Sequence, residues 1–162
     1  MYHRPGSIAA VSTFNGLPAH VLFVHFIVVL APLTAVLAIL CAVWPAARQR
    51  LVWLVVALSV ITAVLTPLTT EAGEWLEHRV GGSPAVRAHA ELGDTMIYFS
   101  LALLVAAALL AVWQVSAERD RSLSTVLTVT VAVFVVVAGV ATVVQVYRIG
   151  DSGATATWGQ LG

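Results

Sequence analysis

Residues 17–26 read Leu17-Pro18-Ala19-His20-Val21-Leu22-Phe23-Val24-His25-Phe26 and open the first long apolar segment of the chain. The apolar run continues to Val43, which is long enough to cross a bilayer as a helix. Two histidines therefore lie where a membrane helix normally carries no ionisable side chain. Because such a group is costly in hydrocarbon, the pair marks a candidate functional site.

The composition of the whole chain agrees with a membrane protein. Of the 162 residues, 60% are hydrophobic and only 10% are charged, whereas a soluble domain has about 25% charged residues. The formal net charge is zero, which argues against a nucleic-acid partner. The lone Cys41 excludes an intrachain disulfide and a cysteine-based zinc site. The first apolar run exceeds the roughly 7–15 residues of a signal-peptide core, so we expect it to be retained.

Four apolar segments cover about residues 21–43, 51–68, 92–115 and 126–147. Each is close to the roughly 20 residues that a membrane helix needs. The sequence therefore predicts an all-α fold, a four-helix transmembrane bundle forming a single domain over 1–162, with a short helical insert between the second and third spans. Ser83-Pro84 is a helix-start signal, so we expect the third helix to begin before it enters the bilayer. The segment Gly150–Gly153 is interpreted as a turn.

Four crossings place the N-terminus, the insert and the C-terminus on one side of the membrane. All five histidines then lie in or near one outer layer of the protein. The two short connections on the opposite side carry Arg48, Arg50, Arg119 and Arg121. Since arginine is enriched in cytoplasmic loops, this density predicts that both termini are outside.

The first functional hypothesis is a b-type haem with His25 and His89 as axial ligands, held between the first and third spans. Haem iron takes histidine ligands from facing helices of a bundle. Gly93 and Met96 fall on the same helical face as His89, and the glycine leaves space for a flat macrocycle. In this hypothesis His20 is a neighbouring or alternative ligand, and Glu74 and Asp94 tune the ligands.

The second hypothesis is a transition-metal ion held by histidine and carboxylate, a ligand set that suits zinc, copper or iron. A third is a pathway or sensor for protons or small ions, since histidine titrates near neutral pH. The alternative to all three is a membrane scaffold or interaction subunit in which the histidines only make structural hydrogen bonds. The candidate metal ligands are His20, His25, His89 and Glu74. Glu71 and His78 are further candidates, because they share one face of the expected insert helix with Glu74.

The stretches Gly16–His20 and Val24-His25-Phe26 resemble the signature of a bacterial family of four-helix predicted membrane proteins, domain of unknown function 2231. The segments Ala72–Trp75, Arg87-Ala88-His89 and Gly150–Gly153 fit the same pattern. The resemblance implies the architecture and a bacterial cytoplasmic membrane, and it makes His20, His25 and His89 family-typical positions. Relatives often carry a histidine in the glycine-rich tail, where this chain has Asp151.

No nucleophile elbow, phosphate-binding loop or HExxH zinc motif occurs in the chain. We therefore predict no catalytic residues. The best-supported activity is that of an electron-transfer or accessory subunit that binds haem b or a metal ion. Its expected partners are the lipid bilayer and either other membrane or respiratory subunits or a second copy of itself.

Overall fold

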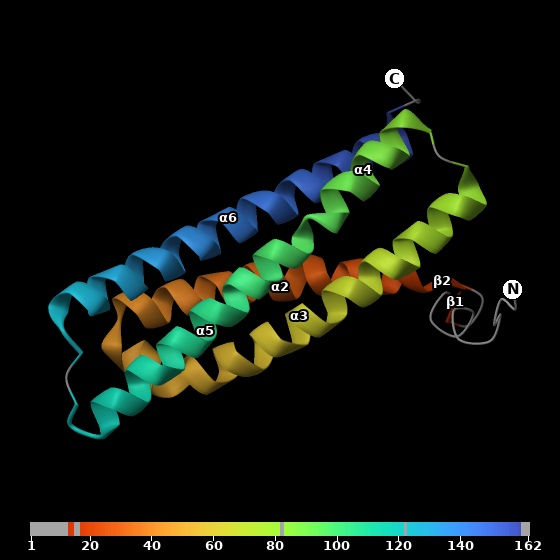
Figure 1. Ribbon diagram of the computed structural model, residues 1–162. Helices are drawn as coiled ribbons and strands as arrows, with labels where there is room; N and C mark the ends of the chain where they lie inside the picture. Colours follow the sequence, from red (N-terminus) through yellow and green to blue (C-terminus); the bar gives the residue numbers. More distant parts are fainter. Residues whose placement is uncertain (1–12, 15–16, 82, 122, 160–162) are drawn as a thin grey trace, which may run out of the picture.

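The computed structural model describes residues 13–14, 17–81, 83–121 and 123–159. The strands β1 (Thr13–Phe14) and β2 (Leu17–Pro18) form a short antiparallel pair ahead of the first helix. The rest of the described chain is helical (Figure 1). The helices are α2 (Ala19–Val43), α3 (Pro45–Val80), α4 (Pro84–Asp94), α5 (Met96–Glu118) and α6 (Thr125–Trp158).

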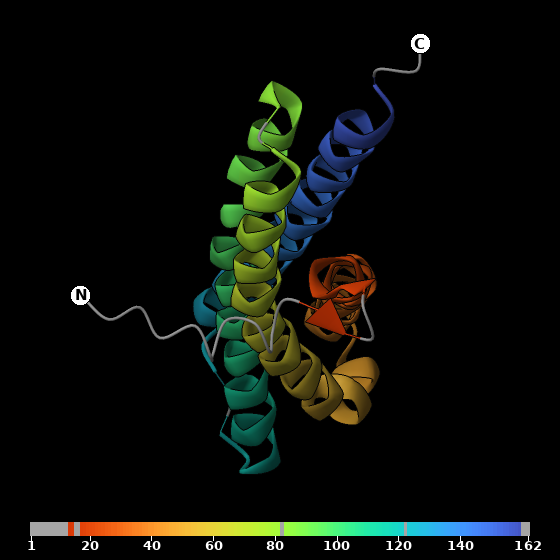
Figure 2. The same ribbon diagram turned by 90° about the vertical axis from the view of Figure 1, so that its right-hand side faces the viewer.

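Four helical segments are long and apolar enough to cross a membrane, with α4 and α5 forming one of them. They contain 25, 35, 35 and 34 residues, and their mean hydropathy lies between 2.4 and 2.8. The predicted all-α bundle with four spans is therefore confirmed. Around the bundle the order is α2, α3, α5, α6, each helix packing against the next. Figure 2 looks onto the end of the bundle where α2 begins. At this end, the ribbons of α4 and α6 lie apart from the start of α2.

Small residues let the helices approach one another closely. On α2, Ala31, Ala35 and Ala38 recur at three- and four-residue spacing and are fully buried. Opposite them, a Cβ added to Gly139 of α6 would lie 2.8 Å from the Ile39 side chain and 3.3 Å from the Ala35 carbonyl oxygen. Close approach of this kind is how membrane helices gain packing energy without a hydrophobic driving force between them.

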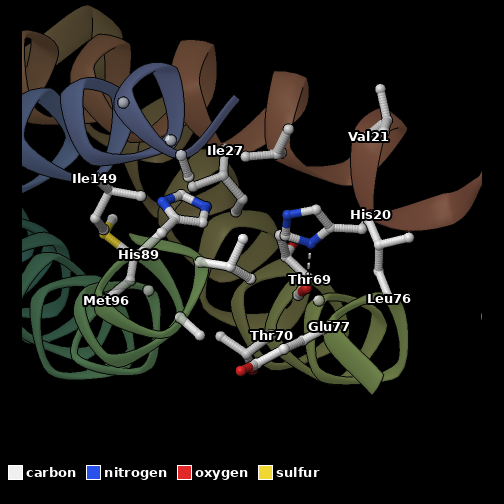
Figure 3. A pocket seen from close by; sticks show the side chains of 18 of the residues that line it. His20, Val21, Ile27, Thr69, Thr70, Leu76, Glu77, His89, Met96 and Ile149 are labelled. Carbon is white, nitrogen blue, oxygen red and sulfur yellow. Dashed lines mark hydrogen bonds between the residues drawn. The ribbon is translucent and has the colours of Figure 1, made fainter. Parts of the chain in front are cut away.

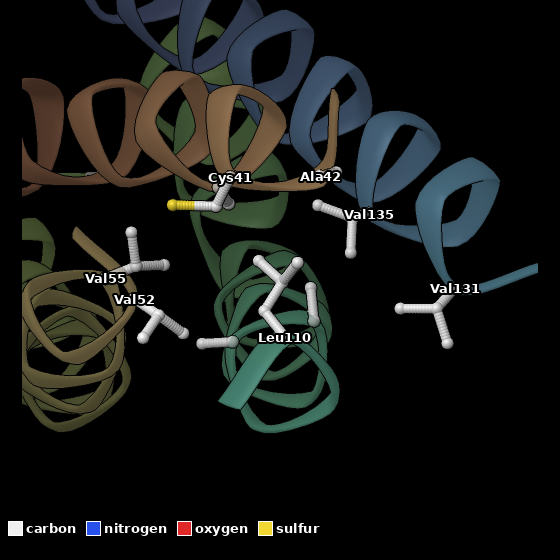
Figure 4. Close-up of a cluster of buried hydrophobic side chains, with 10 residues drawn as sticks. Cys41, Ala42, Val52, Val55, Leu110, Val131 and Val135 are labelled. Carbon is white, nitrogen blue, oxygen red and sulfur yellow. The ribbon is translucent and has the colours of Figure 1, made fainter. Parts of the chain in front are cut away.

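The buried interior has two apolar clusters with hydroxyl groups between them. The cluster near the short connections includes Cys41, Val55 and Leu110 (Figure 4), and the cluster near the opposite end includes Ile27 and Met96. Each hydroxyl donates to a backbone carbonyl of its own helix one turn earlier, so it needs no other partner. The fully buried hydroxyl residues at mid-depth are Thr34, Ser59, Thr62, Ser100 and Thr142.

Several helix boundaries differ from the sequence-based expectation. The insert is helical, but its first half simply continues the second span, because α3 runs unbroken through Pro67 to Val80. Gly81, with φ of 82°, then ends this helix. The Ser83 side chain accepts a hydrogen bond from the Val86 N–H and caps α4, which confirms the predicted start.

The interpretation of Gly150–Gly153 as a turn was wrong. Helix α6 continues through these residues to Trp158. Glycine weakens a helix by only about 1 kcal/mol relative to alanine, and α4 packs against this end of α6. Tertiary packing therefore outweighs the local signal that favoured a turn.

Candidate functional site

The ends of α2, α3, α4 and α6 that lie away from the short connections surround a cavity of about 880 Å³. Its lining is largely apolar or small, with a few polar side chains (Figure 3). Among the residues predicted for a site, the lining includes His20, His25, Glu74, His89, Gly93, Asp94 and Met96.

His20 enters this cavity from the first turn of α2. Its Nδ1 lies 3.0 Å from the Thr69 carbonyl oxygen of α3, so Nδ1 carries the proton and donates it, because a carbonyl only accepts. The ring rests on Gly73, one turn further along α3, where an added Cβ would lie 3.0 Å from Nδ1. Among the described residues, no hydrogen bond reaches Nε2 of this ring.

His89 of α4 is held in the same manner by α6. Its Nδ1 lies 3.0 Å from the Ser152 Oγ, and that hydroxyl donates its own hydrogen to the Ile149 carbonyl oxygen at 2.8 Å. The serine oxygen consequently accepts from Nδ1–H of the histidine. The ring rests on Gly153, where an added Cβ would lie 3.0 Å from Cε1. Again Nε2 is the nitrogen left free.

The two rings face each other across the cavity. Their centroids are 6.5 Å apart and their planes are inclined by 82°. In Figure 3 the His20 nitrogen that Thr69 does not engage is the one turned toward His89. Within the described part of the chain, no three histidine, cysteine or acidic side chains come close enough to hold one metal ion. Among the described residues, the site therefore has two opposed imidazoles and no third histidine, cysteine or carboxylate close enough to join them.

The structure thus sets His20, and not His25, opposite His89. His25 is exposed on α2, and its Nδ1 bonds to the Val21 carbonyl oxygen of its own helix. Gly93 faces open space, since an added Cβ would meet nothing within 4 Å. Met96 is buried beneath the cavity, whereas Glu74 and Asp94 are exposed at its rim. His78 and Glu71 are exposed and do not belong to the lining.

A break between α4 and α5 lies about two turns beyond His89. Helix α4 ends at Asp94 and α5 begins at Met96, with Thr95 between them. The Thr95 hydroxyl donates to the Leu92 carbonyl oxygen at 2.6 Å, and the buried Gln145 of α6 approaches that oxygen to 3.3 Å. Gln145 Nε2 also lies 2.7 Å from the Thr95 Oγ1. The buried amide of Gln145 therefore links the α4–α5 break to α6, about two turns from His89.

Sequence reasoning missed the residues that support the two rings, namely Thr69, Ser152, Gln145 and the packing role of Gly73 and Gly153. A sequence pattern could have identified His20 as the inward-facing histidine. The buried small-residue stripe of α2 begins at Ala31, and His20 precedes it by 11 residues, close to three full turns. His20 therefore shares the inward face of α2, while His25 does not. The short segments that carried the family resemblance also converge on this one cavity.

Comparison with known proteins gives one match. A family model described as "Predicted membrane protein (DUF2231)" matches residues 16–161. No curated protein and no solved structure matches the chain.

Proposed function

Since the chain belongs to the DUF2231 family of predicted membrane proteins, we propose that this integral membrane protein binds a b-type haem between His20 and His89 and transfers electrons through it. The observation that carries the proposal is the pair of free Nε2 atoms on two imidazoles whose centroids are 6.5 Å apart. His20 takes the place that the sequence suggested for His25. The hypothesis otherwise keeps His89 as the second ligand.

The separation of the rings suits one metal atom between them. A metal-to-imidazole bond is about 2.0–2.1 Å, so two coordinating nitrogens lie about 4 Å apart and the ring centroids about 6 Å apart. The observed 6.5 Å is close to this value. The inclination of the rings is no obstacle, because each axial imidazole can rotate about its own bond to the metal.

The donor set favours haem over a bare ion. Structural zinc takes four protein ligands and catalytic zinc three, but the described residues offer only the two imidazoles. A haem brings four equatorial nitrogens and needs only two axial ligands from the protein. The surrounding 880 Å³ cavity, with Gly93 and Gly150 in its wall, gives a flat apolar macrocycle room that a single ion would not need.

The hydrogen bonds behind each ring support the same function. Metal-bound histidines commonly donate their second ring N–H to a carbonyl or another acceptor, which fixes the tautomer and the orientation of the ring. Thr69 and Ser152 accept such bonds here. Neither bond would have to change for Nε2 to coordinate iron.

The proposal extends to the orientation of the protein in a bacterial cytoplasmic membrane. Arg48, Arg50, Arg119 and Arg121 lie at or beside the two short connections, which favours that end as cytoplasmic. The haem would then sit in the outer half of the bundle, where an accessory electron-transfer subunit could meet a respiratory partner or a second copy of itself.

The test is a visible absorption spectrum of detergent-purified full-length protein, expressed with ample haem and recorded oxidised and after dithionite. We expect a Soret band and sharp reduced bands in the native protein. His20→Ala and His89→Ala are expected to remove these bands, while His25→Ala and His78→Ala are expected to keep them. In His89→Gly, added imidazole should restore the bands, because it can occupy the vacated axial position.

Circular dichroism and gel filtration on the same samples establish that each variant is folded. A featureless spectrum from folded native protein would overturn the haem proposal. The remaining hypotheses would then be a bound metal ion, tested by metal analysis, and a membrane scaffold in which the histidines only make hydrogen bonds between helices. Loss of haem in His25→Ala with retention in His20→Ala would instead restore the pairing first suggested by the sequence.

A further inference from the structure

His25 is a polar group with an unused acceptor in an apolar setting. It lies six residues after Ala19, which places it about 9 Å along α2 from the start of the helix. The side chain is exposed, and its neighbour Phe26 is exposed as well. Nδ1 bonds to the Val21 carbonyl oxygen, so it carries the proton and leaves the Nε2 lone pair free. Among the described residues no hydrogen bond reaches Nε2, and such an unpaired group is costly in hydrocarbon.

The cavity beside His25 opens toward the bilayer. Val21 and Val28 both belong to its lining, and each is 44% exposed on the outer surface of α2. Val28 lies about 13 Å along the helix from Ala19, well inside the apolar span. The cavity wall between these residues therefore reaches the outer surface of α2, which faces lipid chains when this helix spans a bilayer. A hydrophobic molecule entering from that side would not pass through water.

The polar and apolar features together define the ligand that would fit. We propose that the cavity admits a lipid-soluble hydroquinone from the bilayer, whose hydroxyl group donates a hydrogen bond to Nε2 of His25. A flat apolar ring suits the surface formed by Val21, Val24 and Val28, which belong to the cavity lining on the His25 side of α2. An alkyl tail would remain in the bilayer beside Val28. Lipid acyl chains have no donor to offer Nε2, so they would leave His25 unsatisfied.

The hydrogen bond to Val21 determines which ligands His25 can distinguish. Since Nδ1–H is used by Val21, Nε2 can accept but not donate. A hydroquinone offers a hydroxyl donor, whereas its dimethyl ether has the same ring and no donor. The inference concerns ligand binding at His25 and does not depend on a haem between His20 and His89.

The experiment is a calorimetric titration of full-length protein in lipid nanodiscs with a decyl-substituted benzohydroquinone and with its dimethyl ether. Dithionite is present throughout, so neither ligand nor haem changes its oxidation state, and empty nanodiscs serve as the blank. We expect saturable binding of the hydroquinone at least tenfold tighter than that of the ether. His25→Phe should abolish this preference. Val28→Trp should weaken the binding of both ligands, because the larger side chain narrows the opening. Val29 is exposed but does not line the cavity, so Val29→Trp should change neither affinity.

Two results would overturn the inference. One is the lack of saturable hydroquinone binding to the native protein. The other is equal binding of hydroquinone and ether, which would mark the cavity as a site for lipid chains only. The visible spectrum of each sample reports its haem content separately, so failure of the hydroquinone site and failure of the haem proposal are told apart.

Discussion

His20 and His89 lie with their ring centroids 6.5 Å apart, although they come from α2 and α4 and are held by two different further helices. Each ring uses Nδ1 on a neighbouring helix and rests on a glycine of that same helix. The same combination of hydrogen bond and glycine contact therefore occurs twice, once between α2 and α3 and once between α4 and α6. Both rings line the same cavity, so the two separate supports bring His20 and His89 together in one cluster.

The glycine beneath each ring gives the first prediction. A Cβ at Gly153 would lie 3.0 Å from the His89 Cε1 and 3.3 Å from its Nδ1, whereas a Cβ at Gly150 would meet nothing within 4 Å. In a helix, alanine is favoured over glycine by about 0.8–1.0 kcal/mol. Gly150→Ala should therefore raise the free energy of unfolding in detergent by about that amount. Gly153→Ala should show no such gain.

The same two variants differ in their effect on the ring itself. Nitrogen-15 spectra of the histidine side chains should change for His89 in Gly153→Ala and remain unchanged in Gly150→Ala. Gly73→Ala should act on His20 in the same way, since its added Cβ would lie 3.0 Å from the His20 Nδ1. Equal stabilisation by Gly150→Ala and Gly153→Ala would contradict the close contact between Gly153 and the His89 ring.

The second prediction concerns the buried amide at the α4–α5 break. Gln145 bonds to the Thr95 Oγ1 at 2.7 Å and approaches the Leu92 carbonyl oxygen. Hydrogen bonds between membrane helices contribute about 0.6 kcal/mol on average and up to about 1.7 kcal/mol. Gln145→Leu should therefore lower the free energy of unfolding by roughly 1 kcal/mol. A double-mutant cycle with Thr95→Val should give a coupling energy of similar size, and additive effects would exclude a direct bond.

The sequence predicted the four spans because apolar length is the main requirement for crossing a bilayer. It also predicted the start at Pro84, since the Ser83 cap is a local signal. The pairing of His89 was harder to predict, because His20 and His25 are about 140° apart on one helix and only one can face inward. Which one does so depends on the rotation of α2. That rotation is set by Ala31, Ala35 and Ala38, whose burial depends on the other helices.

The helical tail shows a second limit of local reasoning. Gly150 and Gly153 favour a turn by themselves, yet α6 continues because α4 lies against it. Ser152 consequently faces His89 from a helix and not from a loop. No local pattern contains this contact, since 63 residues separate the two partners.

The third prediction concerns Arg48 at the opposite end of the bundle. Its side chain is only 7% exposed, its guanidinium carbon lies 3.8 Å from the centroid of a Trp113 ring, and Nη1 donates to the Cys41 carbonyl oxygen at 3.4 Å. A desolvated cation–π contact is worth about 2 kcal/mol. Trp113→Leu should therefore cost about that much in the free energy of unfolding, because the buried cation loses its aromatic neighbour.

The matched control for this variant is Trp53→Leu, since Trp53 is 58% exposed. Surface substitutions usually change stability by no more than about 0.5 kcal/mol. Both variants are to be compared by denaturant titration in the same detergent. Equal losses in the two would mean that the stacking of Arg48 on Trp113 adds nothing. Arg48→Lys should also destabilise, because an ammonium lacks the planar surface that stacks.

The close approach of α2 and α6 at Gly139 gives the last prediction. A Cβ at Gly139 would lie 2.8 Å from Cδ1 and 2.9 Å from Cγ1 of Ile39, and 3.3 Å from the Ala35 carbonyl oxygen. Overpacking of this kind typically costs about 1–3 kcal/mol. Gly139→Ala should lower the free energy of unfolding within that range. Combining it with Ile39→Ala should cost less than the sum of the single variants, because the second change removes the two shortest contacts. Strict additivity in this cycle would mean that the helices separate to accept the methyl group, and that the contact at Gly139 does not fix their distance.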